Sequence, residues 1–174
     1  MRLVADTGKK LKDRKEQKMS DVQQWLWQLV GEWTYELRTA DDSDHPGVLI
    51  EGTESVRAIG DTWIVSENKG KTSDGDDSHT ITIIGYEPEK KRFTGAVAGT
   101  AVPTLFVYDG SLGEDGTALM LETEGPAMSE GNDIDRYRDI ICIVGHGDRE
   151  TIAQVLAVNG EWREFMRTRY HRAI

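Results

Sequence analysis

The positions of apolar and polar residues predict one short helix near residue 20. Its apolar residues are three and four positions apart, as on one face of a helix: Val22, Trp25, Leu26 and Leu29. Ser20 and Gln23 have the spacing of a capping box, so we expect the helix to begin at Ser20. Gly31 follows the last apolar residue, and we expect it to end the helix in a left-handed conformation.

From Trp33 onward the apolar residues recur at every second position, which is the period of a β-strand. This pattern, with its turn residues, predicts ten strands, at residues 32–40, 47–58, 62–70, 79–87, 92–100, 104–112, 117–124, 134–144, 149–158 and 161–172. Turns that favour a positive φ separate several of them: Asp74-Gly75, Asp115-Gly116, Gly145-His146-Gly147-Asp148 and Asn159-Gly160. No second helix is predicted.

This series of strands predicts an all-β fold, an up-and-down antiparallel β-barrel of about ten strands with one short N-terminal helix. Consecutive strands joined by hairpins form a meander, and closing the meander into a barrel removes its two exposed edges. We expect a single barrel domain over residues 20–174. Residues 1–19 carry seven basic and three acidic side chains without a periodic apolar face, so we expect a mobile basic tail there. A basic arm that recruits a partner is the alternative.

Composition narrows the classes of partner. The formal net charge is −10, which argues against binding to nucleic acid or to an anionic membrane, because such partners require clustered Lys and Arg. No apolar run reaches the ~20 residues that span a bilayer, and the N-terminus has no apolar signal segment, so we expect a cytoplasmic protein. The four histidines, His45, His79, His146 and His171, lack the spacing of metal ligands, so we predict no metal and no cofactor.

Barrel closure predicts one specific contact. Closure requires the last strand to pair antiparallel with the first, so the end of one lies beside the start of the other. On the last strand Trp162, Met166 and Tyr170 form the more apolar side, so we expect them to face inward together with Arg172. Arg172 then lies near Trp33, where its guanidinium can stack on the indole and hydrogen-bond the carbonyls at the end of the helix. We expect this contact to seal one end of the barrel.

These residues carry a resemblance to known barrel families. Gly31-Glu32-Trp33 after a short helix, with an Arg at the end of the last strand, resembles the lipocalin and calycin signature. The chain is also similar to the bacterial domain of unknown function numbered 1579, over roughly residues 25–172. The shared features are the "GEW" opening, the segment "TIIGYEP" at residues 82–88, and a closing Met166, Tyr170 and Arg172.

The resemblance implies a calycin-like barrel, and it implies no catalytic residues. Small barrels either fill their interior with side chains or enclose one ligand. The fatty-acid-binding branch of the calycins ends in Arg-x-Tyr, whereas Thr168 precedes Tyr170 by two positions here. This difference argues against a specific fatty-acid site.

Charged residues on the strands are the first candidates for a ligand site. Glu54 alternates in phase with the apolar residues of its strand, so it is expected inside, where an unpaired carboxylate would cost several kcal/mol. Arg136 and Arg138 are in phase with Ile140, Cys142 and Val144, which makes them possible partners of Glu54 or of an anionic ligand head. The opposite phase places Tyr137, Ile141 and Ile143 inside and leaves both arginines in water, and the sequence leaves this choice open.

The remaining candidates are Glu67, a second possible inward carboxylate, and three tyrosines that could present hydroxyl groups to a ligand: Tyr86, Tyr108 and Tyr170. Ordinary packing or exposure to solvent is the alternative for each. The sequence has no nucleophile elbow and no phosphate-binding Gly loop.

The sequence as a whole favours a lipocalin-like barrel that binds a small hydrophobic or amphiphilic molecule. The first alternative is an enzyme that uses Glu54 or Glu67 as acid or base in the same cavity. The second is a packed barrel that acts as an interaction or scaffold protein. The sequence does not predict the oligomeric state.

Overall fold

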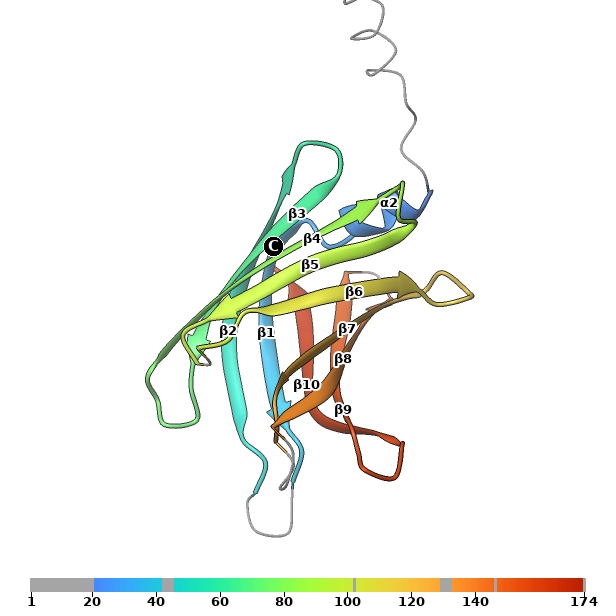
Figure 1. The fold of residues 1–174 in the computed structure, drawn as a ribbon. Helices are drawn as coiled ribbons and strands as arrows, with labels where there is room; N and C mark the ends of the chain where they lie inside the picture. The colour runs from blue at the N-terminus through green and yellow to red at the C-terminus, as the bar shows by residue number, and fades with distance from the viewer. Residues whose placement is uncertain (1–20, 42–45, 102, 129–132, 146, 174) are drawn as a thin grey trace, which may run out of the picture.

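The computed structural model describes residues 21–41, 46–101, 103–128, 133–145 and 147–173 (Figure 1). The predicted basic tail, residues 1–19, and the predicted cap residue Ser20 lie outside the described residues. Among the described residues there is one helix and there are ten strands. No helix in this part of the chain is long and apolar enough to cross a membrane.

The elements follow the predicted order, and each strand boundary lies within two residues of its prediction. The helix is α2 (Asp21–Trp27), and the strands are β1 (Gly31–Thr39), β2 (Leu49–Ile59), β3 (Trp63–Lys71), β4 (Asp77–Glu87), β5 (Arg92–Gly99), β6 (Phe106–Leu112), β7 (Ala118–Pro126), β8 (Ile134–Val144), β9 (Asp148–Leu156) and β10 (Trp162–Arg172). The glycines of the predicted turns have positive φ, for example Gly75 at 87° and Gly160 at 83°.

The ten strands form one closed, antiparallel barrel in which each strand pairs with its neighbours in sequence and β1 pairs with β10 (Figure 1). The predicted all-β, up-and-down barrel is therefore confirmed. Trp33 is the register partner of Arg172, and Tyr35 is the partner of Tyr170. The pairing of β1 with β10 leaves no unpaired edge in the described sheet.

The end of the helix differs from the prediction. Helix α2 ends at Trp27, and backbone hydrogen bonds from Leu29 to Leu26 and from Val30 to Trp27 form a tighter turn after it. Gly31 is the first residue of β1, with a φ of 143°, and is not the left-handed residue that ends the helix. The helix therefore stops earlier, and Gly31 has another role at the start of β1.

Helix α2 covers the end of the barrel at which β1 begins and β4 ends (Figure 1). Its Trp25 and Leu26, with Leu29 just after it, are buried in the main apolar cluster together with residues from the strands around this end. At the opposite end Asp135, Tyr137 and Val155 are buried, whereas other inward side chains keep part of their surface exposed: Leu37, Ile50, Val97, Phe106 and Met166. The barrel thus has a closed end and an open end.

A bulge in β10 changes which residues face inward. The register between β9 and β10 shifts between Glu164 and Met166. The alternation of inward and outward residues therefore changes phase at this point: even-numbered residues of β10 face outward before the bulge and inward after it. Met166 and Tyr170 face inward as predicted, whereas Trp162 lies on the outer face. The prediction that Trp162 faces inward is therefore wrong, because alternation cannot be continued across a bulge.

Candidate functional site: the barrel interior

The closed end of the barrel contains the predicted contact between Trp33 and Arg172. The guanidinium carbon of Arg172 lies 4.2 Å from the centre of the Trp33 ring. Its two terminal nitrogens donate hydrogen bonds to the carbonyls of Val30 and Gln28, at 2.9 and 3.0 Å. The indole nitrogen of Trp33 donates to the carbonyl of Leu29 at 2.9 Å. Trp33 and Arg172 therefore join the last strand and the first strand to the turn after the helix.

Gly31 is required by this same contact. A Cβ atom at residue 31 would overlap the guanidinium of Arg172, which passes directly over the backbone at this point. The φ of 143° is also one that residues with a side chain rarely adopt. The Gly that precedes Trp33 by two positions thus leaves room for the Arg172 side chain to reach the end of the helix.

Glu54 and Arg149 form a buried ion pair above Trp33. Glu54 is 5% exposed and Arg149 is 4% exposed, and one terminal nitrogen of Arg149 contacts Oε2 of Glu54. The other carboxylate oxygen, Oε1, accepts hydrogen bonds from the Ser66 hydroxyl at 2.5 Å and from the Asn68 amide at 3.4 Å. Both oxygens of Glu54 are therefore engaged within the protein.

Two aromatic rings hold the guanidinium of Arg149. Its central carbon lies 4.6 Å from the centre of the Trp33 ring and 4.0 Å from that of Tyr170. Burial lowers the pKa of Arg149, and the neighbouring Tyr170 opposes this effect. A cation between two π faces and beside a carboxylate stays charged even though it is buried.

The sequence predicts that Glu54 faces inward with a partner, but it does not identify Arg149 as that partner. Arg149 faces inward because it pairs with Tyr170 across the β9–β10 ladder, after the bulge has shifted the register. Counting back from the Asn159-Gly160 turn without a bulge places Arg149 opposite Arg169, on the outer face. The signal that could have identified it is the need of an inward Glu54 for a cation near the closed end.

A second inward carboxyl group, Asp139, lies on β8. Its Oδ2 accepts a hydrogen bond from the hydroxyl of Tyr108 on β6. Burial raises the pKa of Asp139 to about 6, and the Tyr108 hydrogen bond acts in the opposite direction. Burial and the nearby Asp139 raise the pKa of Tyr108 well above its usual value, so Tyr108 stays protonated and donates a hydrogen bond to Asp139.

Tyr170 lies near both the Glu54–Arg149 pair and Asp139. Burial raises the pKa of Tyr170, while the nearby Arg149 opposes this effect and the nearby Asp139 adds to it. Its ring lies 5.7 Å from that of Tyr35, centre to centre. Gly52 and Gly70 on the facing strands make room for Tyr35, because a Cβ atom at either position would overlap the Tyr35 ring or its hydroxyl. We call the inward polar residues of this region the interior polar cluster: Tyr35, Glu54, Ser66, Asn68, Tyr108, Asp139, Arg149 and Tyr170.

Arg136 and Arg138 do not belong to this cluster. The inward residues of β8 include Asp135, Tyr137 and Ile141, so the structure has the second of the two orientations that the sequence allowed. Arg136 is exposed and pairs with Glu122 at 2.9 Å. Arg138 donates to Gln154 at 2.7 Å and stacks on Trp162 at 4.3 Å on the outer face. The inward placement considered for these arginines is therefore corrected: the register of β8 with β7 and β9 puts Tyr137 and Ile141 on the inner side and both arginines on the outer side.

Glu67 and Tyr86 also lie outside the interior polar cluster. Glu67 is on the outer face of β3, where Lys69 and then His79 lower the pKa of its carboxyl group. The expectation that Glu67 faces inward is therefore wrong. Tyr86 packs edge-on against Phe93, with 5.2 Å between ring centres, as part of the apolar core near the helix. Of the candidate carboxylates, only Glu54 reaches the interior.

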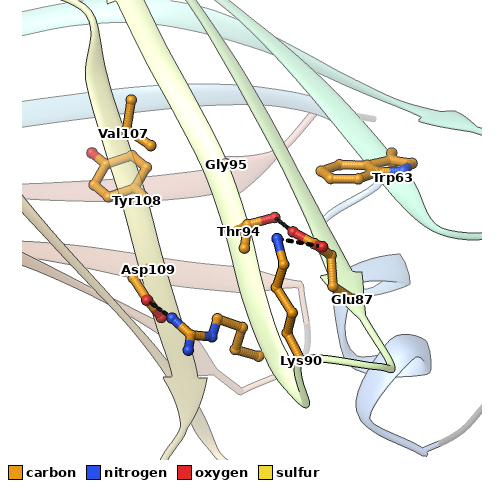
Figure 2. A pocket seen from close by; sticks show the side chains of 9 residues that line it. Trp63, Glu87, Lys90, Thr94, Gly95, Val107, Tyr108 and Asp109 are labelled. Carbon is orange, nitrogen blue, oxygen red and sulfur yellow. Dashed lines mark hydrogen bonds and ion pairs between the residues drawn. The ribbon is translucent and has the colours of Figure 1, made fainter.

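An open pocket of about 600 Å³ lies along β3 to β6 (Figure 2). Figure 2 shows Glu87 turned toward Lys90 and toward the Thr94 hydroxyl. Asp109 forms an ion pair with Arg92. These pairs leave no unmatched charge among them. Its lining residues are Trp63, Glu87, Lys90, Arg92, Thr94, Gly95, Val107, Tyr108 and Asp109. The interior of the barrel is therefore the stronger candidate, because buried polar groups converge there.

Within the part of the chain that the structure describes, no group of three or more His, Cys, Asp or Glu side chains could hold a metal ion. The interior polar cluster consists instead of hydroxyl groups, one amide, one ion pair and one separate carboxyl group. Such a set can donate and accept hydrogen bonds and can change its charge through Asp139.

Comparison with known proteins supports the fold. The crystal structure of Rv2717c from M. tuberculosis has a TM-score of 0.57 and 12% identity, covering 90% of this chain and 100% of that one. The S-type phycobiliprotein lyase CPES from Guillardia theta has a TM-score of 0.58 and 13% identity, covering 92% and 97%. Identities this low show a shared barrel fold and no more.

No curated protein matches this chain. The family described as "Protein of unknown function (DUF1579)" matches residues 18–172, which include the helix and all ten described strands. The earlier resemblance to this family is thereby confirmed. The chain belongs to the DUF1579 family.

Proposed function

We propose that this protein binds one small amphiphilic molecule inside its barrel. The observation that carries the proposal is the change in polarity along the interior. Half-buried apolar side chains line the open end, among them Leu37, Ile50, Val97 and Phe106. Deeper in the barrel lies the interior polar cluster, and below it α2 and the Trp33–Arg172 contact close the end.

This arrangement supports binding over filling by side chains alone. Deep in the barrel, Asp139 and Tyr170 are only half-buried, although neighbouring strands surround them. A packed apolar interior would leave no partly exposed polar groups at this depth. Small ligand sites in barrels combine apolar walls with a few polar groups that fix orientation, and this interior has both. The apolar part of a ligand would contact the open end, and its polar head would meet the cluster.

Titration with neutral amphiphiles tests the proposal. The purified protein is titrated with N-phenyl-1-naphthylamine, whose fluorescence increases in apolar surroundings, and 1-decanol is then added as a competitor. We expect saturable binding at one site, displacement by 1-decanol and a rise in melting temperature. Absence of saturable binding for both compounds would refute the proposal.

Two Trp substitutions on β5 locate the site. Val97 faces inward near the open end, whereas Ala98 is exposed on the outer face of the same strand. Val97→Trp should block the interior and weaken binding at least tenfold, about 1.4 kcal/mol. Ala98→Trp is the matched control and should bind as the unmodified protein does. Equal binding by both variants would place the probe outside the barrel and count against the proposal.

A further inference from the structure

Not every charged side chain deep inside the barrel has a partner of opposite charge. Glu54 and Arg149 pair with each other and neutralise one another. Asp139 receives a hydrogen bond from Tyr108, and among the described residues no Lys, Arg or His lies within ion-pair distance of it. The deep interior therefore contains one carboxyl group without a cationic partner.

The geometry around Asp139 leaves one of its oxygens available. Tyr108 donates to Oδ2, and no hydrogen bond within the described part of the chain reaches Oδ1. The residues paired with Asp139 on the neighbouring strands are Leu121 and Ala153, which have no polar side-chain atoms. A carboxylate only accepts hydrogen bonds, so the group that complements Oδ1 is a donor.

We propose that Asp139, held by Tyr108, is the polar recognition group of the interior and selects an amphiphile whose head is a protonated amine over one whose head is a carboxylate. This inference rests on the proposed binding function and defines the ligand class. It differs from the anionic head that the sequence allowed, which depended on Arg136 and Arg138 facing inward. Since both arginines lie on the outer face, no described cation is free in the deep interior to meet an anion.

The titratable and charged groups around Asp139 support the same assignment. Tyr108 on β6 and Tyr170 on β10 keep their protons, because burial raises the pKa of both hydroxyl groups. Arg149 on β9 is neutralised by Glu54 on β2. Near neutral pH, Asp139 is thus the group in this region that changes charge, with a pKa raised to about 6 by burial.

The test compares three ligands with the same chain length and different heads: decylamine, 1-decanol and decanoate. Each displaces N-phenyl-1-naphthylamine from the full-length protein near pH 7.5 at physiological salt, below its micelle concentration. We expect decylamine to bind at least about tenfold more tightly than decanoate, because its ammonium group can donate a charge-assisted hydrogen bond to Asp139 whereas a carboxylate head would be repelled. 1-Decanol should lie between the two.

Substitution of Asp139 tests whether this residue causes the preference. Asp139→Asn keeps the size of the side chain and an acceptor for Tyr108, and it should reduce the preference for the amine to less than about threefold while 1-decanol binding is retained. Asp109→Asn, on the outer face of β6, is the matched control for the loss of one negative charge. An amine preference that survives in Asp139→Asn, or that falls equally in Asp109→Asn, would overturn the inference.

The pH profile gives a second, independent measurement. Decylamine stays protonated between pH 5 and 8, so its affinity should rise about tenfold from pH 5 to pH 7.5 as Asp139 ionises around pH 6. Tyr108→Phe removes a hydrogen bond that lowers the pKa of Asp139, so the midpoint of this rise should move to higher pH. A flat profile in the unmodified protein, or an unchanged midpoint in Tyr108→Phe, would overturn the inference.

The outcomes separate the two proposals. Binding of 1-decanol without a preference for the amine would leave the proposed function in place and refute the role of Asp139. Failure of all three compounds and of the probe to bind would refute the proposed function itself, and the inference about the head group would fall with it.

Discussion

Removing either member of the Glu54–Arg149 pair should destabilise the barrel far more than removing both. Glu54→Gln leaves the guanidinium of Arg149 buried without a counter-charge, and Arg149→Met leaves the Glu54 carboxylate in the same position. Each single change should lower the free energy of unfolding by about 3 to 5 kcal/mol, the usual cost of an uncompensated buried charge. Loss of the two ring contacts of Arg149 accounts for about 1 to 2 kcal/mol of the second value.

The double variant should recover much of this loss. With Gln at residue 54 and Met at residue 149, neither charge remains buried, and the Gln oxygen can still accept from Ser66. Its amide N–H groups lack a partner, so we expect a net cost of about 1 to 3 kcal/mol. The coupling energy between the two positions should therefore be at least about 2 kcal/mol.

Urea unfolding followed by tryptophan fluorescence measures all four proteins of this cycle near pH 7.5. The control cycle uses Glu122→Gln and Arg136→Met, an exposed pair whose side chains are 45% and 53% accessible to solvent. Its coupling should be below about 1 kcal/mol. Equal coupling in the two cycles would refute the reasoning about the interior. A Glu54→Gln variant as stable as the unmodified protein would favour the acid or base role considered for Glu54.

Three further predictions concern the closed end of the barrel and Asp139. Trp33→Ala should lower the free energy of unfolding by about 3 to 5 kcal/mol in urea unfolding, because it empties a buried ring position, and a loss below about 1 kcal/mol would contradict the closed end. Arg172→Gln should cost about 1 to 2 kcal/mol in the same assay through the lost stacking on Trp33 and the two lost hydrogen bonds to the Val30 and Gln28 carbonyls, and no loss would contradict the seal. Burial raises the pKa of Asp139 to about 6, so the folded protein favours the protonated carboxyl, and this contribution to stability is complete below about pH 4 and is lost as the pH rises through 6. Asp139→Asn removes this pH-dependent loss. Urea titrations at pH 4 and pH 7.5 should show that the free energy of unfolding of Asp139→Asn, relative to that of the unmodified protein, is higher at pH 7.5 by up to about 3 kcal/mol. The same difference between the two proteins at both pH values would contradict the raised pKa.

The strands could be predicted from the sequence because each has one wet face and one buried face. The alternation then appears directly in the residue types, and glycines with positive φ mark the turns. The Trp33–Arg172 contact followed from two facts that need no side-chain detail: the sheet closes, and the two residues lie at the paired ends of β1 and β10. Local pattern and chain closure were sufficient for the frame of the barrel.

The contents of the interior were less predictable, for two physical reasons. On β8 both sides carry apolar residues, so alternation could not choose between Arg138 and Asp139 as the inward group. On β10 the bulge between Glu164 and Met166 reverses the alternation, which moves Trp162 outward and brings Arg149 opposite Tyr170. A one-residue change of phase exchanges every side chain on a strand, so small local irregularities decide the chemistry of the interior.

The polar interior itself argues for a function beyond folding. Apolar side chains of similar volume in place of a buried ion pair usually leave a protein equally stable or more stable. Asp139 adds a further cost, because its raised pKa means that burial opposes its ionisation near neutral pH. A barrel selected for stability alone would fill these positions with residues such as Leu121, which is buried beside Asp139. The presence of Asp139, with one oxygen that no described group bonds, is accounted for if the interior has to recognise a polar group that enters it.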